Sequence, residues 1–154
     1  MTYIRAAVIA AALGSLAGPA TAQDFANEVG ARQGMFRIMG LNVGVLGGMA
    51  RGNIPYDADA AQVAASNLVA VSGINPLNMF PPGSDNMALD TTRAAPEIWD
   101  NIADVGEKWA GFGTAAAGLQ AVAGDGQAAL GPALGALGGS CQACHEAYRG
   151  PERN

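Results

Sequence analysis

The sequence predicts an all-α protein that folds as an antiparallel four-helix bundle. Alanine and glycine are abundant, and no stretch alternates apolar and polar residues for long enough to form strands. Four segments instead repeat apolar residues every three or four positions, which is the period of one helix face. Short turns join most of these segments, so consecutive helices are expected to lie side by side and antiparallel.

Residues 1–22 precede the predicted bundle and have the features of a signal peptide. Arg5 is followed by an apolar run over residues 6–18, and "PATA" then ends in a small-x-small pattern, so cleavage is expected after Ala22. The alternative, a membrane anchor, needs about 20 apolar residues, and this run is shorter. The sequence therefore predicts export to the periplasm, one domain over 23–154 and no membrane attachment after cleavage.

The charge of the predicted mature chain argues against one class of partner. All thirteen acidic residues but only seven of the eight basic ones lie in residues 23–154, which changes the net charge from −5 to −6. No run of basic residues is present. Nucleic acid is therefore not an expected partner.

The first two helices are predicted over residues 25–52 and from Asp57 or Asp59, as the cap, to about Ser72. The inward face of the first carries six residues: Val29, Arg32, Phe36, Met39, Val43 and Leu46. The inward face of the second carries four: Ala60, Ala64, Leu68 and Val71. The connection from Gly73 to Ala95 is long enough to wrap over something.

The last two helices have the clearest periods. The third is predicted as one helix within 96–126, with Pro96 in its first turn and an apolar stripe of Ile98, Ile102, Val105, Trp109, Phe112, Ala116 and Leu119. The fourth ends near Tyr148 and carries Leu130, Leu134, Leu137, Cys141, Cys144 and Tyr148 on one face. Pro132 predicts that this helix either begins there or bends there.

The segment "GGSCQACHEAYRG" holds both cysteines of the chain and its only histidine. A thioredoxin-like redox pair would start a helix after a strand, and a structural zinc site needs a fourth ligand. The third alternative, C-x-x-C-H, is the attachment site of a c-type haem. Residues at i, i+3 and i+4 share a helix face, so we expect one haem c bound through Cys141 and Cys144, with His145 as an axial iron ligand.

Four motifs together resemble the cytochrome c′ family, the class II c-type cytochromes. They are "RQGMF", "GNIPYD", "PEIW" and the C-terminal "CQACHEAYR", and the resemblance covers essentially the whole mature chain in the same order. It implies a four-helix bundle around one haem, a homodimer through the first two helices, and His145 as the proximal ligand.

The resemblance also implies which residue covers the other side of the iron. The family's distal residue lies four positions after the arginine of the Arg32–Gln33 pair, which is Phe36 here. Phenylalanine has no ligating atom, so we expect a five-coordinate, high-spin iron that binds NO and CO. The alternative is a six-coordinate His/Met haem ligated by Met35 or Met39, which would act purely as an electron carrier.

The arginines are candidates for the haem periphery. Arg32 and Gln33 match a family pair that lies near the haem propionates, and Arg93 is placed to reach the same edge. Arg149 matches a family arginine near the proximal histidine, or else it is a solvated charge that interacts with the helix dipole. Trp99 and Trp109 are expected to be packing residues rather than contacts of the haem.

Nothing in the sequence points to an enzyme. His145 is the only histidine, which leaves no second imidazole for general-base work, and no paired carboxylates mark a cleft. The expected partners are small gases and an unidentified redox protein.

Overall fold

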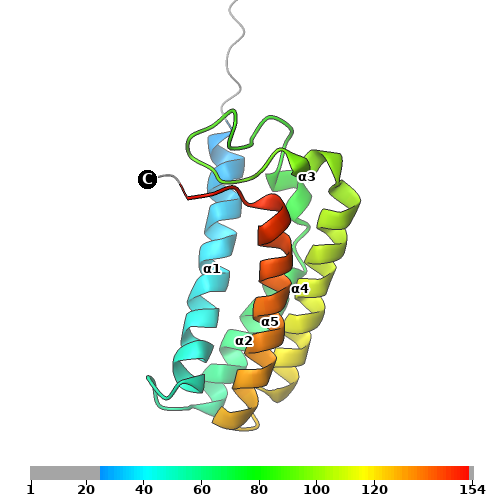
Figure 1. The fold of residues 1–154 in the computed structure, drawn as a ribbon. Coiled ribbons are helices and arrows are strands. Elements are labelled where there is room, and N and C mark those ends of the chain that lie inside the picture. The colour runs from blue at the N-terminus through cyan, green and yellow to red at the C-terminus, as the bar shows by residue number, and fades with distance from the viewer. Residues whose placement is uncertain (1–24, 153–154) are drawn as a thin grey trace, which may run out of the picture.

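The computed structural model describes residues 25–152, and the predicted signal peptide, residues 1–22, lies outside them. The elements are α1 (Ala26–Ala50), α2 (Ala58–Ser72), the 3-10 turn η1 (Pro76–Met79), α3 (Glu97–Asp100), α4 (Ile102–Val122) and α5 (Gln127–Tyr148). The four long helices run alternately up and down, and each packs against two neighbours in the order α1, α2, α4, α5 (Figure 1). The predicted antiparallel four-helix bundle is confirmed.

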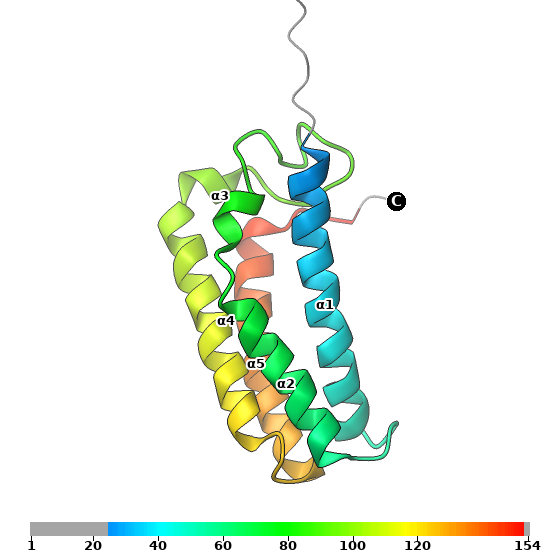
Figure 2. The ribbon, with the colours of Figure 1, turned by 180° about the vertical axis from the view of Figure 1, so that it is seen from behind.

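The connection from α2 to α3 crosses one end of the bundle. The start of α1 and the end of α5 lie at this same end, so the connection passes close to both (Figures 1 and 2). Its last residues pair with the chain after α5 through an isolated antiparallel bridge between Ala94 and Arg149. None of the helices in residues 25–152 is long and apolar enough to cross a membrane.

Most of the largest fully buried side chains in the core are leucines. The fully covered leucines are Leu46 on α1, Leu68 on α2, Leu119 on α4, and Leu130 and Leu137 on α5. Burial of each side chain stabilises the fold by about 1.5–3 kcal/mol before the cost of ordering it. Every long helix therefore contributes to one shared core.

The buried face of α1 differs from the predicted one at two positions. Phe36 and Val43 are predicted to face inward, but Phe36 is 39% exposed and Val43 is only half-buried. Met35 and Asn42, each one position earlier, are buried instead. Because neighbouring residues on a helix are about 100° apart, this difference moves Phe36 from the centre of the core to a flank.

The predicted cap of α2 is confirmed, and its inward face is wrong at one position. The Asp57 carboxylate accepts a hydrogen bond from the Ala60 amide at 2.8 Å, which satisfies one of the free N–H groups of the first turn. Ala60 itself is exposed, and Ala61 is buried in its place.

The single helix predicted within 96–126 is wrong at Asn101, which separates α3 from α4. Asn101 has φ −132° and ψ 40°, and its side-chain Nδ2 donates to the Glu97 carbonyl at 3.1 Å. In a continuous helix that carbonyl would accept the backbone N–H of residue 101, so the side chain competes with the helix. Ile102, predicted to face inward, is 42% exposed as a result.

The helix α5 passes through Pro132 and begins at Gln127, five residues before it. Of the two alternatives that the sequence leaves open, a start near the proline is therefore wrong. Gly126 precedes the helix with φ +114°, a conformation that glycine adopts without strain. This turn lets the chain leave α4 and enter α5 within a few residues.

Candidate functional site

The two cysteines and the histidine lie on one side of α5, close to its C-terminal end. All three side chains are half-buried, so the cysteines border the core and are not enclosed by it. Cys141 packs against the main core cluster, whereas Cys144 packs against a smaller cluster that contains Ile98, Val105 and Tyr148. Both thiols are free, and burial raises the pKa of each.

The imidazole of His145 is suited to bind a metal. Burial lowers its pKa, and the positive charges of Arg149 and Arg93 lower it further. A lowered pKa keeps the ring neutral near pH 7, and the neutral ring has a free lone pair for a metal ion. His145 is therefore the residue of this cluster that is ready to act as an axial ligand.

The α1 side chain that meets His145 is Phe36. The two ring centroids are 6.5 Å apart, with an angle of 69° between the ring planes. The flank position of Phe36 thus brings it beside α5, where the sequence predicts the distal residue. Phe36 remains 39% exposed, so an apolar surface beside His145 is left partly uncovered.

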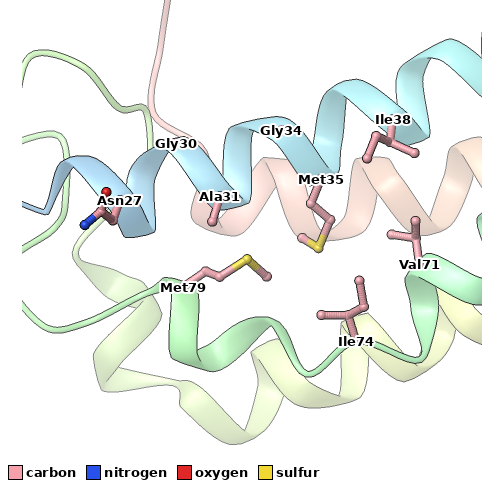
Figure 3. A pocket seen from close by; sticks show the side chains of 9 residues that line it. All are labelled: Asn27, Gly30, Ala31, Gly34, Met35, Ile38, Val71, Ile74 and Met79. Carbon is pink, nitrogen blue, oxygen red and sulfur yellow. The ribbon is translucent and has the colours of Figure 1, made fainter.

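The two candidate methionine ligands lie elsewhere on α1. Met39 is buried in the main core cluster. Met35 lines a cavity of about 510 Å³ between α1 and the end of α2, and in Figure 3 its side chain points toward Met79 of η1. Phe36, rather than either methionine, is therefore the α1 residue placed against the His145 ring.

The guanidinium of Arg32 is buried and holds the connection between α2 and α3. It donates to the Met79 carbonyl (3.0 Å), the Ser84 hydroxyl (2.8 Å), the Ser84 carbonyl (2.5 Å) and the Thr92 hydroxyl (2.7 Å). It also lies over the Phe80 ring, 4.6 Å from the centroid. Burial lowers its pKa, while the Asp85 carboxylate acts in the opposite direction.

Gln33, the next residue of α1, is also hydrogen-bonded to the connection between α2 and α3. Its Nε2 donates to the Thr91 carbonyl at 2.6 Å in an exposed contact. Ser84 and Thr92, which receive the Arg32 bonds, were not identified from the sequence, because this segment has no helical or strand period. The only sequence signal for them was the unusual length of the connection.

Arg93 and Arg149 flank the chain that leaves α5. Arg93 Nε donates to the Gly150 carbonyl at 2.8 Å, and its Nη1 pairs with the Glu152 carboxylate at 3.1 Å. The Arg149 side chain is exposed, and its backbone N–H donates to the His145 carbonyl. Both charges act on His145, although Arg93 mainly binds the C-terminal segment.

Trp109 packs against the main core cluster and Trp99 against the smaller one. Each also donates a hydrogen bond from its indole N–H to the connection between α2 and α3. Trp99 donates to the Phe80 carbonyl at 2.9 Å. Trp109 donates to the carbonyls of Ser72 and Ile74, at 3.0 Å and 2.9 Å. The connection is therefore fixed to α4 as well as to α1.

Residues 27–149 match the sequence model of the family described as Cytochrome C′. The chain belongs to the cytochrome c′ family. It is 39% identical to cytochrome c-554 of Cereibacter sphaeroides over 137 residues, which cover 87% of this chain and 90% of that protein. The structure of a cytochrome c′ from Rhodobacter sphaeroides matches with a TM-score of 0.80 at 36% identity and covers 84% of this chain and 100% of its own.

Two structures of cytochrome c′ variants from Alcaligenes xylosoxidans also match. One has bound NO and the other has bound carbon monoxide; both have a TM-score of 0.71, with 29% and 31% identity. They cover 84% and 83% of this chain, respectively, and 98% of their own chains.

Proteins of the cytochrome c′ family carry one c-type haem and are not enzymes, as the sequence predicts. The described residues fit this group. Two free thiols lie one helical turn apart on α5, a neutral imidazole follows them, and the Phe36 ring offers uncovered apolar surface opposite. Cys141 and Cys144 are therefore the residues that would hold the haem, and His145 the residue that would ligate its iron.

A hydrogen-bonded group beside the attachment site was not found from the sequence. The Tyr148 hydroxyl donates to Asp104 Oδ2 at 2.5 Å, and Lys108 lies 3.5 Å from the same oxygen. The sequence predicts Tyr148 only as an apolar-face residue, because periodicity does not reveal a partner on another helix. This group ties the end of α5 to the start of α4, and Cys144 packs against the smaller cluster that contains Tyr148.

The Tyr148–Asp104 bond predicts an alkaline transition. The hydrogen bond to Asp104, with burial and the nearby negative charges adding to it, raises the pKa of Tyr148 to about 12. A raised pKa means that the bond contributes its full stability below about pH 10, the ordinary tyrosine value, and loses it as the pH rises through about 12. Denaturant unfolding should therefore show stability falling across this range in the native protein and less so in Tyr148→Phe.

An ultraviolet titration of tyrosinate checks the same assignment. Tyr56 remains in the Tyr148→Phe variant as an internal reference. The variant should lack the titration step near pH 12. A variant that keeps this step and loses one at the ordinary tyrosine pH would show that Tyr148 is not the shifted group.

Proposed function

We propose that this chain is a periplasmic c-type haem protein whose iron is five-coordinate and high-spin, which transfers electrons to and from a redox protein and binds NO and CO. The contact between Phe36 and His145 carries this proposal, because the side chain opposite the ligand has no atom that binds iron. The relatives from Alcaligenes xylosoxidans with bound NO and CO support the choice of ligands.

Each residue of the site has a distinct part in this function. When bound, the haem supplies a one-electron couple and an iron with one open coordination position. His145 provides the lone pair on one side and is kept neutral by burial and two arginines. Phe36 presents only carbon on the other side, which disfavours water and anions and favours small uncharged molecules.

We propose that the positive and amide groups at the same end act on the haem propionates. Arg93 and Arg149 place positive charge beside His145, and Arg32 and Gln33 lie on the adjoining part of α1. Arg32 and Gln33 already donate to the connection, so pairing with a propionate would add to these bonds or replace one of them. Charge-assisted hydrogen bonds of this kind are strong enough to compete.

Binding of carbon monoxide to the reduced protein tests this function. We expect CO to convert a five-coordinate spectrum directly into a six-coordinate, low-spin one, because no protein group has to leave the iron. Absorption spectra recorded during a CO titration, and then an NO titration, measure this change. A reduced protein whose spectrum does not respond to either gas would contradict the proposal.

We further propose that the protein forms a homodimer through α1 and α2. Large apolar side chains are exposed on these helices and around the cavity between them: Ile38 (51%), Leu41 (70%), Val63 (60%) and Ile74 (47%). Large apolar side chains exposed on neighbouring helices are candidates for a contact with another protein. A second copy of this chain is the occupant that agrees with the family resemblance.

Replacing Leu41 with glutamate is expected to yield a monomer. The substitution introduces a charge into the most exposed of these side chains, where burial in a contact would cost several kcal/mol. Met87→Glu is a matched control, because Met87 is 82% exposed and belongs to the connection rather than to α1 or α2. Sedimentation velocity should give twice the monomer mass for the native protein and the control. A native protein that is already monomeric would overturn the dimer.

A further inference from the structure

The connection between α2 and α3 is hydrogen-bonded to both helices that carry the site, α1 and α5. We call residues 84–95 the strap. At one point the strap is bound to α1 through Arg32, whose Nη2 donates to the Thr92 hydroxyl at 2.7 Å and to the Ser84 carbonyl at 2.5 Å. Arg32 is 2% exposed and Ser84 is fully covered, so water does not compete for these bonds.

At a second point the strap is bound to the chain that follows His145. Ala95 N–H donates to the Tyr148 carbonyl at 3.0 Å, and Gly150 N–H donates to the Arg93 carbonyl at 2.8 Å. The bridge between Ala94 and Arg149 and the Arg93 bond to the Gly150 carbonyl complete this contact. The partners of the strap in this contact, Tyr148, Arg149 and Gly150, lie within five residues of His145 in the sequence.

One buried hydroxyl links the two points. Thr92 Oγ1 accepts from Arg32 on one side and from the Ala94 backbone N–H, at 3.1 Å, on the other. Ala94 is the bridge residue, and its two neighbours, Arg93 and Ala95, make the backbone bonds to the chain at the end of α5. Thr92 therefore connects Arg32 of α1 to the segment that binds the end of α5. Thr92 is 6% exposed, and removing its oxygen would leave two buried donors without an acceptor.

The direction of the His145 ring depends on its backbone. A metal-bound histidine is usually held by a hydrogen bond from its second ring nitrogen. Within residues 25–152, the His145 ring makes a contact with Phe36 and no hydrogen bond to another side chain or carbonyl. Because the ring contacts Phe36, its position depends on how the end of α5 lies relative to α1. The two helices pack on each other, and the strap adds a second connection between them close to His145.

We propose that the strap is a positioning device for the proximal ligand: Arg32 and Thr92 hold the end of α5 against α1 and thereby set the orientation of His145 toward the iron. This inference rests on His145 as the axial ligand of the proposed function. It gives Arg32 a role through Thr92 that is separate from any contact with a propionate.

The test compares Thr92→Val with Thr92→Ser in the haem-loaded protein. Valine keeps the shape and removes the oxygen, whereas serine keeps the oxygen. Thr114→Val is the matched control, because it removes an exposed threonine hydroxyl from α4. The readouts are the iron–histidine stretching band of the reduced protein, the midpoint potential, and hydrogen exchange at the amides of Ala95 and Gly150.

We expect Thr92→Val to shift the stretching band and the potential and to accelerate exchange at both amides by roughly three- to tenfold. Thr92→Ser and Thr114→Val should match the native protein. Faster exchange with an unchanged band and potential would overturn the proposal, because the strap would then be only structural.

A second variant covers the case in which Thr92→Val does not fold. Arg93→Lys keeps the positive charge beside His145 but lacks the Nε group that donates to the Gly150 carbonyl, and it should shift the same band in a folded protein. An unchanged band would again overturn the proposal. Failure of the five-coordinate proposal is recognised separately: native protein would then lack the iron–histidine band, and the midpoint potentials alone would test the strap.

Discussion

Protein exported with both Cys141→Ser and Cys144→Ser is expected to contain no covalently bound haem. The two thiols are the only sulfhydryl groups of the chain, and both lie free on the same side of α5. A serine hydroxyl cannot replace a thiol in the thioether bonds that hold a c-type haem. The intact mass of the purified, denatured protein should therefore equal that of the polypeptide alone.

The control for this experiment changes neighbouring residues on the same helix. Ser140→Ala and Gln142→Ala remove polar groups beside the cysteines, whose bonds go to the Leu137 carbonyl and to Glu146. Both variants should retain the mass of one haem. Retention of that mass in the double serine variant would show that attachment occurs elsewhere.

Replacing Phe36 with methionine is expected to convert the iron to a six-coordinate, low-spin state. Phe36 is the α1 side chain that meets the His145 ring, and methionine is flexible enough to reach an iron between them. The thioether would then compete with exogenous ligands, so CO affinity should fall roughly tenfold or more. The reduction potential should rise, as it does for His/Met haems in general. Absorption spectra, CO titration and a redox titration measure these three effects.

Two variants of the native methionines control for a general disturbance of α1. Met35→Leu and Met39→Leu keep buried apolar volume in the cavity wall and in the core. Neither should change the spectrum if Phe36 is the residue opposite His145. A change of spin state in either one would favour the His/Met alternative.

Much of the fold follows from local sequence patterns. Each fully covered leucine belongs to an inward face that the helical period predicts, and Asp57 precedes α2 with the side chain that a helix N-terminus prefers. Some errors come from the rotation of a helix, as at Phe36 and Ala60, and one comes from a side chain that interrupts the period. Asn101 has no unusual position in the apolar stripe of 96–126, yet its amide takes the Glu97 carbonyl and ends α3.

The candidate site also contains residues that local sequence spacing brings together and contacts that depend on how the helices pack. Cys141, Cys144 and His145 are adjacent in sequence and on one helix, so their spacing alone brings them together. The contact of Phe36 with His145 depends on how α1 is rotated in the bundle, and the apolar period places that rotation one residue away from the observed one. Distant partners such as Thr92 for Arg32, or Asp104 for Tyr148, leave no periodic signal at all.

The resonance Raman spectrum of the reduced protein, without added ligand, tests the central claim most directly. The claim is that His145 is the sole protein ligand of the haem iron and that Phe36 covers the opposite side. We predict high-spin, five-coordinate marker bands and an iron–histidine stretching band that is lost when CO binds. A six-coordinate, low-spin spectrum in the absence of any added ligand would contradict the account.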